Sequence, residues 1–323
     1  MAYPDATAAR TQRRDDPLPA AGSGGQRDRT TMRPGREGPA EELLLAYLRE
    51  QFGELLTQQR RVQAEEPDAI HKMRVSTRRM RSALTSYRRL LAPEPARTLR
   101  TELKWLAQLL GAARDAQVMR HRLQDLVASQ PPELVLGSVS ARIDEVLLSD
   151  YAAAVRNIGV ELQGRRYGRV VDGLSALVLE PAWTADAGSS GPETAERMIR
   201  RDRSRLRSRI RKAKAEEDRE LHAEILHEAR KEAKRLRYAA EVWKPAGGQA
   251  AEVMADAAEG LQKTLGEHQD SVVTRALLRR MGSLPGPGEN GFTYGRLHAI
   301  EEMRAEAAER QFRRLWKHFP KGP

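Results

Sequence analysis

Cysteine is absent from this chain of 323 residues, and aromatic side chains make up only 5% of it. The first absence excludes disulfide bonds, thiolate metal sites and a cysteine nucleophile, and it fits a reducing compartment. The second disfavours a surface that stacks bases on aromatic rings. The chain also has no apolar run near the roughly 20 residues that cross a bilayer, and it begins without the apolar stretch of a signal peptide. We therefore expect a cytoplasmic protein that does not insert into membranes.

Positive charge is what the chain has in excess. Its 56 Lys and Arg outnumber its 45 Asp and Glu, which leaves a formal net charge of +11. Such a balance favours polyanionic partners, which include nucleic acid, phosphate polymers and anionic membrane. Charge alone does not choose among them.

Apolar residues recur with helical spacing along most of the chain. No segment alternates convincingly with the period of a β-strand, so we expect an all-α protein. Residues 1–38 lack this periodicity and are rich in Arg, Gly and Pro, so we predict a disordered tail. The predicted helices cover 41–62, 68–92, 99–110, 115–127, 133–158, 167–179, 193–214, 220–243, 250–265, 271–281 and 294–319.

Helix-breaking residues set several of these boundaries. We expect Pro93 to end the second helix, and Pro245 with Gly247-Gly248 to stop the helix that begins near residue 220. Gly111 is expected to break another helix. The Gly- and Ser-rich stretch from Pro181 to Pro192 is the best internal linker.

A basic helical segment occurs twice. The first copy is HKMRVSTRRMR, which begins at His71, and the second is HEARKEAKRLR, which begins at His227. Each histidine is followed by basic residues at +3, +7, +8 and +10. Offsets 0, 3, 7 and 10 return to one face of an α-helix, so each segment presents one histidine and three cations along a stripe. Because like charges on neighbouring turns repel, we expect an anionic ligand to offset the repulsion.

The repetition extends beyond the stripes. A Leu-Gly-x-x-x-Asp sequence occurs at residues 110–115 and again at 265–270. His227 follows His71 by 156 residues, and Gly266 follows Gly111 by 155. The near-constant offset predicts an internal duplication. The predicted units are repeat one at about 41–182, a linker at about 183–192 and repeat two at about 193–320.

The aspartate of each Leu-Gly-x-x-x-Asp sequence has an ordinary interpretation. We expect Asp115 and Asp270 to stand at the start of the next helix, where a carboxylate caps free amide groups and suits the helix dipole.

The doubled basic segment and the two Leu-Gly-x-x-x-Asp sequences resemble the CHAD domain, the conserved histidine α-helical domain, over residues 39–320. The resemblance implies two four-helix bundles related by a pseudo-two-fold axis, with a basic groove or pore between them. It also implies a binding module for inorganic polyphosphate that is not an enzyme and that associates with polyphosphate granules. Some members carry a triphosphate tunnel domain with a Glu-x-Glu-x-Lys motif, and this sequence has no such motif.

The residues themselves suit a phosphate polymer, which carries a regular negative charge and no bases. Arginine grips phosphate oxygens with two hydrogen bonds. No Asp or Glu lies between His71 and Ala92, and the stretch from Arg197 to Lys214 has ten basic residues against one acid, Asp202. The predicted polyphosphate-binding residues are His71, Arg74, Arg78, Arg79, Arg81, Arg88, Arg200, Arg203, Arg207, Arg211, Lys214, His227, Arg230, Lys231, Lys234 and Arg237.

The two stripe histidines predict a pH dependence. Neighbouring arginines should disfavour protonation of His71 and His227 until phosphate arrives. Binding should therefore take up protons and strengthen as the pH falls from about 8 to 6. The other five histidines lack this context, and we interpret them as structural or exposed.

Nucleic-acid binding is the main alternative function, although the sequence has no helix-turn-helix, zinc-finger or RNA-recognition motif. An enzyme acting on polyphosphate would need an acid cluster for a metal, a glycine-rich phosphate loop or a histidine nucleophile. The sequence has neither that loop nor paired acids near the stripes, so we predict no catalytic residue, no metal and no cofactor. A phospho-accepting His71 and a scaffold without a small ligand are weaker alternatives.

Overall fold

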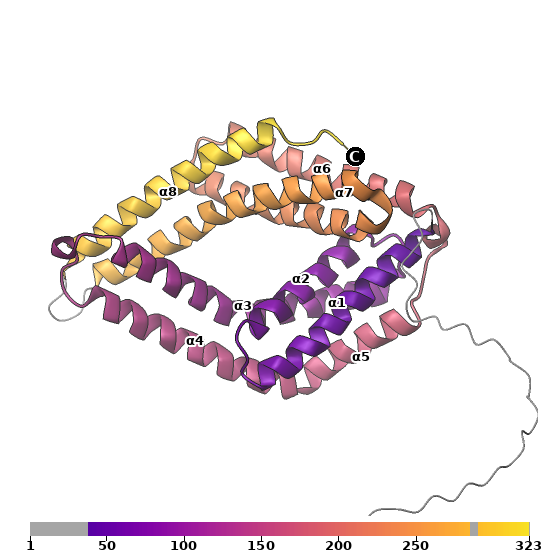
Figure 1. Cartoon of the computed structure of the whole chain (residues 1–323), viewed down its shortest axis with the longest axis horizontal. Helices are drawn as coiled ribbons and strands as arrows, with labels where there is room; N and C mark the ends of the chain where they lie inside the picture. Colours follow the sequence, from indigo (N-terminus) through magenta and orange to yellow (C-terminus); the bar gives the residue numbers. More distant parts are fainter. Residues whose placement is uncertain (1–37, 285–289, 323) are drawn as a thin grey trace, which may run out of the picture. The chain divides into compact units, whose positions relative to one another are not determined.

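The structure is a computed structural model that describes residues 38–284 and 290–322 (Figure 1). Within these ranges the chain forms eight α-helices, two short 3-10 turns and no β-strand, which confirms the all-α prediction. The predicted disordered tail lies outside the described residues except for Gly38. No helix in the described ranges is both long and apolar enough to span a membrane. The helices are α1 (Ala40–Gln63), α2 (Ala69–Ser86), α3 (Pro93–Ala128), α4 (Val139–Gln163), α5 (Arg165–Leu179), α6 (Gly191–Ala215), α7 (Arg219–Ser283) and α8 (Gly291–Lys317).

Helices that follow one another in sequence mostly pack side by side. α1 packs on α2, α2 on α3 and α3 on α4, while α6 packs on α7 and α7 on α8. The two sets meet where α2 contacts α7 and where α1 contacts α6 and α7. The main hydrophobic core takes side chains from both sets, among them Leu48, Met80, Leu206 and Leu236. The two halves therefore share apolar burial, which is the main force that holds them together.

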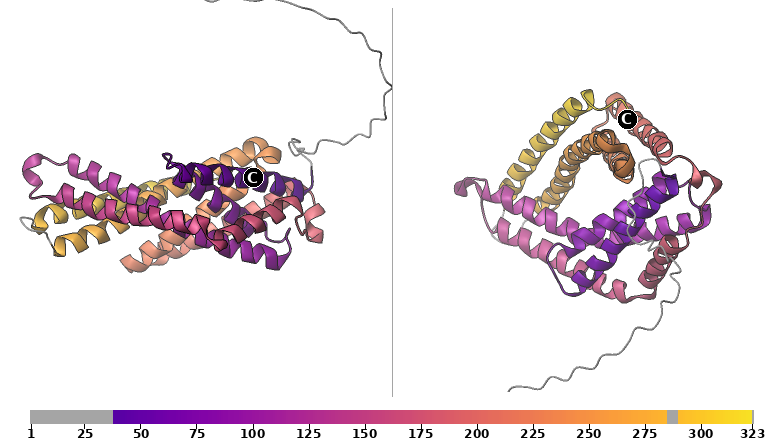
Figure 2. Two further views of the ribbon diagram at one scale, coloured as in Figure 1. Left: turned by 90° about the horizontal axis from the view of Figure 1, so that it is seen from below. Right: turned by 45° about the vertical axis from the view of Figure 1, so that its right-hand side comes forward.

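A smaller hydrophobic core joins the C-terminal ends of α3 and α7 to the N-terminal ends of α4 and α8. It contains Leu123 of α3, Ile143 of α4, Leu278 of α7 and Leu297 of α8. Figure 2 shows the same four helices from two further directions. The halves are thus connected at two separate places, the main core and this one.

α7 is folded back on itself. Gly248 has φ 49° and ψ −133°, a conformation that glycine adopts readily and other residues avoid. The chain reverses there, and the two stretches on either side lie against each other. An ion pair shows this contact, since Nη1 of Arg237 lies 3.2 Å from Oε1 of Glu259. The predicted helix stop is confirmed as the point of reversal, but Pro245 lies inside the helix before it.

Four predicted boundaries are wrong. Gly111 lies inside the uninterrupted α3, and Gly266 lies inside the second stretch of α7, so neither Asp115 nor Asp270 caps a helix. Pro93 begins α3 rather than ending α2, as expected of a residue whose fixed φ suits the first helical position. The helix predicted from residue 133 begins instead at Val139.

The segment between α5 and α6 is bound to the first half of the chain. The amide of Ala40 donates to the carbonyl of Ser189, and the amide of Gly191 donates to that of Gly38, both at 2.9 Å. Further along, the amide of Ala92 donates to the carbonyl of Ala182 at 2.8 Å. The segment predicted as a linker lies between α5 and α6, and backbone hydrogen bonds hold it against the first half of the chain.

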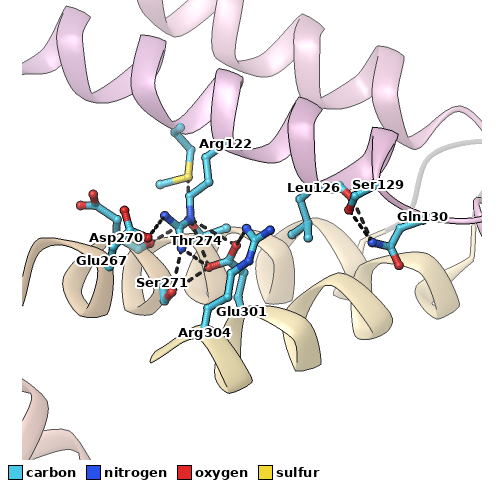
Figure 3. Close-up of polar contacts among 11 residues, drawn as sticks. Arg122, Leu126, Ser129, Gln130, Glu267, Asp270, Ser271, Thr274, Glu301 and Arg304 are labelled. Carbon is cyan, nitrogen blue, oxygen red and sulfur yellow. Dashed lines mark hydrogen bonds and ion pairs between the residues drawn. The ribbon is translucent and has the colours of Figure 1, made fainter. Parts of the chain in front are cut away.

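A buried ion pair ties α3 to α7 and α8 beside the smaller core (Figure 3). Nη2 of Arg122 lies 2.7 Å from Oε2 of Glu301, whose side chain is 0% exposed, and 2.9 Å from the hydroxyl oxygen of Ser271. Nη1 of Arg122 lies 2.9 Å from Glu267, and Arg304 also pairs with Glu301 at 2.9 Å. Burial alone would raise the pKa of Glu301, but the Arg122 and Ser271 hydrogen bonds lower it overall. Every charge in this cluster has an opposite partner.

Candidate functional site

Two rows of basic side chains face each other where α2 packs on the first stretch of α7. We define the α2 row as His71, Arg74, Arg78 and Arg81, and the α7 row as His227, Arg230 and Lys234. Burial lowers the pKa of Lys234 to about 6, and the next causes are the charges of Arg78, Arg230 and Arg74. Burial also lowers the pKa of Arg230, and repulsion by the positive charge of Arg78 lowers it as well. Cations from the two helices are therefore close enough to repel each other.

Arg78 lies at the centre of these interactions. Its charge contributes to the lowered pKa of Arg74 and Arg81 on its own helix, after the larger effect of burial. It acts in the same way on Arg230 and Lys234 across the interface. Within the described residues, Arg78 has neither an ion pair nor a hydrogen bond from its side chain. Arg78 thus lies among other cations of the α2 and α7 rows, and no described carboxylate neutralises its charge.

The two histidines occupy matching positions at the start of each row. Burial lowers the pKa of both, followed by the charge of Arg114 for His71 and of Lys231 for His227. The Nδ1 atoms of both rings are buried and have no hydrogen-bond partner among the described residues. The Nε atoms of Arg74 and Arg230 are also buried and have no hydrogen-bond partner among the described residues. Buried donors and acceptors of this kind are costly to leave unpaired, so they point to a ligand.

The Leu-Gly-x-x-x-Asp sequences lie against Arg74 and Arg230, the arginines that follow the two histidines by three residues. Arg74 lies over Gly111, where an added Cβ would be 3.5 Å from its Nε, and its Nη2 lies 3.3 Å from Asp115. Arg230 lies over Gly266, where an added Cβ would be 3.2 Å from its Nη2. The glycine makes room for the guanidinium, and the aspartate one turn further along helps to orient it.

Asp270 stabilises the charged form of Arg230, as Asp115 does for Arg74. Burial lowers the pKa of Arg230, and Asp270 is the largest effect that opposes this. Sequence reasoning missed both aspartates as parts of the site because it interpreted them as caps. The available signal was their spacing of four residues from a glycine, repeated at nearly the same distance from each row.

Three other predicted contact residues have protein carboxylates as partners. Arg79 lies 3.2 Å from Glu241, and Arg237 lies 2.9 Å from the same side chain. Lys231 is exposed and lies 2.6 Å from Glu228. The structure therefore places these three residues beside the rows rather than within them. Arg114 of α3 was not predicted, yet its charge acts on His71 and Arg74.

The predicted basic face of α6 does not join the two rows. Arg200 is 66% exposed and pairs with Glu196, and Nε of Arg203 donates to the carbonyl of Pro320 at 2.7 Å. Arg207, Arg211 and Lys214 are exposed. These five residues remain predicted contacts, but they do not lie in the α2 row or in the α7 row.

The opposite face of α6 lines a basic pocket of about 510 Å³ together with residues from α2 and α7. Asp202, the single acid of this helix's basic stretch, is fully buried beneath it and accepts a hydrogen bond of 2.5 Å from the Ser86 hydroxyl. We call this the α6 pocket. Its lining residues are Thr85, Arg88, Arg205, Ser208, Arg209, Lys212, Glu232 and Arg235.

A larger pocket of about 770 Å³ lies between α7 and α8. Its lining mixes acids and histidines, including His222, His268 and Glu309. The Nε2 atom of His222 lies 3.1 Å from Glu309. Apart from His227, the cation rows do not contribute to it, so its size does not make it the site for an anion. Over the described ranges, no three His, Asp or Glu side chains group in a way that would hold a metal ion.

Comparison with known proteins gives one family. The family described as the CHAD domain matches residues 46–279. Uncharacterized proteins from two strains of Mycobacterium tuberculosis are 36% identical over 279 residues, which cover 86% of this chain and 53% of each relative. The chain thus spans about half the length of the curated relatives it matches.

Two solved structures share the fold. PptA from Streptomyces chartreusis gives a TM-score of 0.73 at 21% identity, covering 87% of this chain and 100% of PptA. The CHAD domain from the plant Ricinus communis gives a TM-score of 0.68 at 24% identity, covering 90% of this chain and 96% of that domain. At these identities the likeness concerns the arrangement of helices.

Proposed function

We propose, since this chain belongs to the CHAD domain family, that it binds inorganic polyphosphate between the α2 row and the α7 row. The observation that carries the proposal is Arg78, a cation without an ion pair among the described residues, whose charge acts on both rows. Polyphosphate supplies what this arrangement lacks, a line of closely spaced negative charges. Its oxygens would accept hydrogen bonds from the guanidinium groups in pairs.

The same geometry favours polyphosphate over nucleic acid. The cations of the two rows are half-buried between helices, so they suit a thin chain without bases. A duplex presents its phosphates on a wide, stiff surface, and single strands are usually held by stacking on aromatic rings. We therefore assign a binding function without a catalytic step. Cytoplasmic location and association with polyphosphate granules remain predictions that follow from this function.

Internal duplication is part of the proposal. α2 with α3 in the first half corresponds to the two stretches of α7 in the second. In each half, one helix carries the row and its partner carries the glycine and the aspartate. The repeat boundaries near 182 and 193 coincide with the segment between α5 and α6.

The test is calorimetric titration with a long inorganic polyphosphate. A quadruple variant, Arg74→Ala, Arg78→Ala, Arg230→Ala and Lys234→Ala, should lose at least about 100-fold in affinity, because several charge-assisted hydrogen bonds disappear together. Duplex DNA and single-stranded RNA at equal phosphate concentration should not displace the bound polyphosphate.

A charge-matched control separates the site from net charge. It removes three arginines and one lysine that are exposed and lie outside the rows, and it should retain affinity within a few-fold at the same salt. Equal losses in both variants, or displacement by nucleic acid, would overturn the proposal. The control substitutions are Arg60→Ala, Lys104→Ala, Arg169→Ala and Arg280→Ala.

A further inference from the structure

Arg81, the last member of the α2 row, lies one helical turn from Thr85, which lines the α6 pocket. Burial lowers the pKa of Arg81, and the next causes are Arg78 on one side and Arg235 on the other. Arg235 lines the α6 pocket. A chain of cations therefore leads from the centre of the rows past Arg81 and into the pocket.

The pocket contains more positive charge than its own carboxylates neutralise. Arg205 lies 3.6 Å from the buried Asp202, and Arg235 lies 2.8 Å from Glu232. The remaining three cations, Arg88, Arg209 and Lys212, have no ion pair within the described ranges.

Glu232 is the one carboxylate among the lining residues, and it is largely buried. Burial raises its pKa, although Arg235, Arg205 and Arg209 act in the opposite direction. Three neighbouring cations thus surround this acid, and Arg88 and Lys212 remain available for another anion.

Helix geometry explains why this surface differs from the one the sequence suggested. Arg205, Arg209 and Lys212 are spaced by four and three residues, so they share one face of α6. That face turns toward the end of α2 and toward α7, where Arg88 of the turn after α2 and Arg235 of α7 meet it. Arg207, Arg211 and Lys214 lie on the opposite side of the same helix, although Arg88 and Lys212 of the pocket are also exposed.

We propose that the α6 pocket is a second phosphate subsite, which takes the stretch of polyphosphate that runs off the facing rows past Arg81. The inference rests on the proposed function and extends it, because it assigns a direction to the bound chain. A short oligomer that occupies only the rows would not reach the pocket, whereas a long chain would fill both. The pocket therefore makes affinity depend on chain length.

The chain offers a matched pair of variants on one helix. The pocket variant is Arg88→Ala, Arg209→Ala and Lys212→Ala, and the exposed-face variant is Arg207→Ala, Arg211→Ala and Lys214→Ala. Each removes two arginines and one lysine. Both are titrated with tripolyphosphate and with a long polyphosphate, in the full chain and at one salt concentration.

The pocket variant should lose at least about tenfold in affinity for the long polyphosphate, which is the effect of about one strong charge-assisted contact. Its affinity for tripolyphosphate should equal that of the unaltered protein, and this also shows that the variant is folded. The exposed-face variant should change little with either ligand.

Equal losses in the two variants would show that only net charge matters and would overturn the inference while leaving the proposed function intact. A larger loss in the exposed-face variant would overturn it in favour of the other side of α6. If the unaltered protein binds neither ligand, the proposed function fails, and the subsite fails with it.

Discussion

Arginine is used in opposite ways at two places in this protein. Arg122 lies in a cluster in which each charge has a partner, and Glu301 beneath it is 0% exposed. Arg78 lies among Arg74, Arg230 and Lys234 and has no ion pair in the described structure. A buried arginine with its carboxylate holds helices together, whereas cations that repel one another lower the stability of the free protein. The first arrangement stabilises the fold, and the second is relieved when a polyanion binds.

The largest expected effect concerns the paired arginine. Arg122→Ala leaves Glu301 buried without its main partner, and breaking a buried pair in this way costs about 3 kcal/mol of unfolding free energy. Urea denaturation measures the loss. Arg97→Ala, which removes an exposed ion pair with Glu94, should leave the unfolding midpoint unchanged. Equal midpoints for the two variants would contradict the comparison.

The pH dependence of the cation rows is the next largest effect. The pKa of Lys234 falls from its ordinary value of 10.5 to about 6 in the folded protein. Between these values the unfolded chain binds one more proton than the folded chain, so stability should rise with pH, by up to about 1.4 kcal/mol per unit from this group. Lys234→Met should flatten the rise between pH 7 and 9. An unchanged slope in that variant would exclude Lys234 as its source.

The affinity for polyphosphate should depend on pH in the opposite direction to the stability of the free protein. A bound anion favours the protonated amine, so binding should take up protons at pH 7 and weaken as the pH rises from about 6 to 8. His71 and His227, whose pKa values burial also lowers, act in the same direction. Calorimetry in buffers of different ionisation enthalpy counts the protons. Lys234→Met should reduce the count more than either histidine substitution.

Removing the unpaired arginine should have the opposite sign to removing the paired one. Arg78→Met keeps much of the side-chain volume and deletes the charge that, after burial, most lowers the pKa of Lys234. We expect the free protein to gain about 1 kcal/mol of stability while its affinity for polyphosphate falls. Urea denaturation with and without polyphosphate tests both halves of this prediction. A variant less stable than the unaltered protein would refute it.

The smallest expected effect compares the two glycines beneath the arginines. A Cβ at residue 266 would lie 3.2 Å from Arg230, and one at residue 111 would lie 3.5 Å from Arg74. Gly266→Ala should therefore weaken polyphosphate binding a few-fold, whereas Gly111→Ala should have less effect. Both should gain up to about 1 kcal/mol of stability, because alanine is the better helix former. Equal affinities in the two variants would mean that the arginines move aside freely.

The sequence was a good guide to helices and a poorer guide to where they end. Apolar periodicity located α1, α5 and α6 to within a few residues. The expectation that glycine breaks a helix failed at Gly111, because a glycine in mid-helix is tolerated when a neighbouring side chain needs the space above it. Arg74 makes that demand from a different helix, which no local pattern reveals.

Recognition of the site followed the same division. The spacing of His71 and His227 with their basic residues is enough to place each row on one helical face. The same spacing could not show that Arg79 and Arg237 pair with Glu241, which is far from Arg79 in sequence. It also could not choose between the two basic faces of α6, since both have helical periodicity.

The amino-acid sequence by itself determined the helical class, the family and the two cationic stripes, because these depend on periodicity within single helices. Only the tertiary structure decided which cations keep a carboxylate and which are left facing one another. Charge pairing acts over a few ångströms between helices that are far apart in the chain, and packing alone sets those distances.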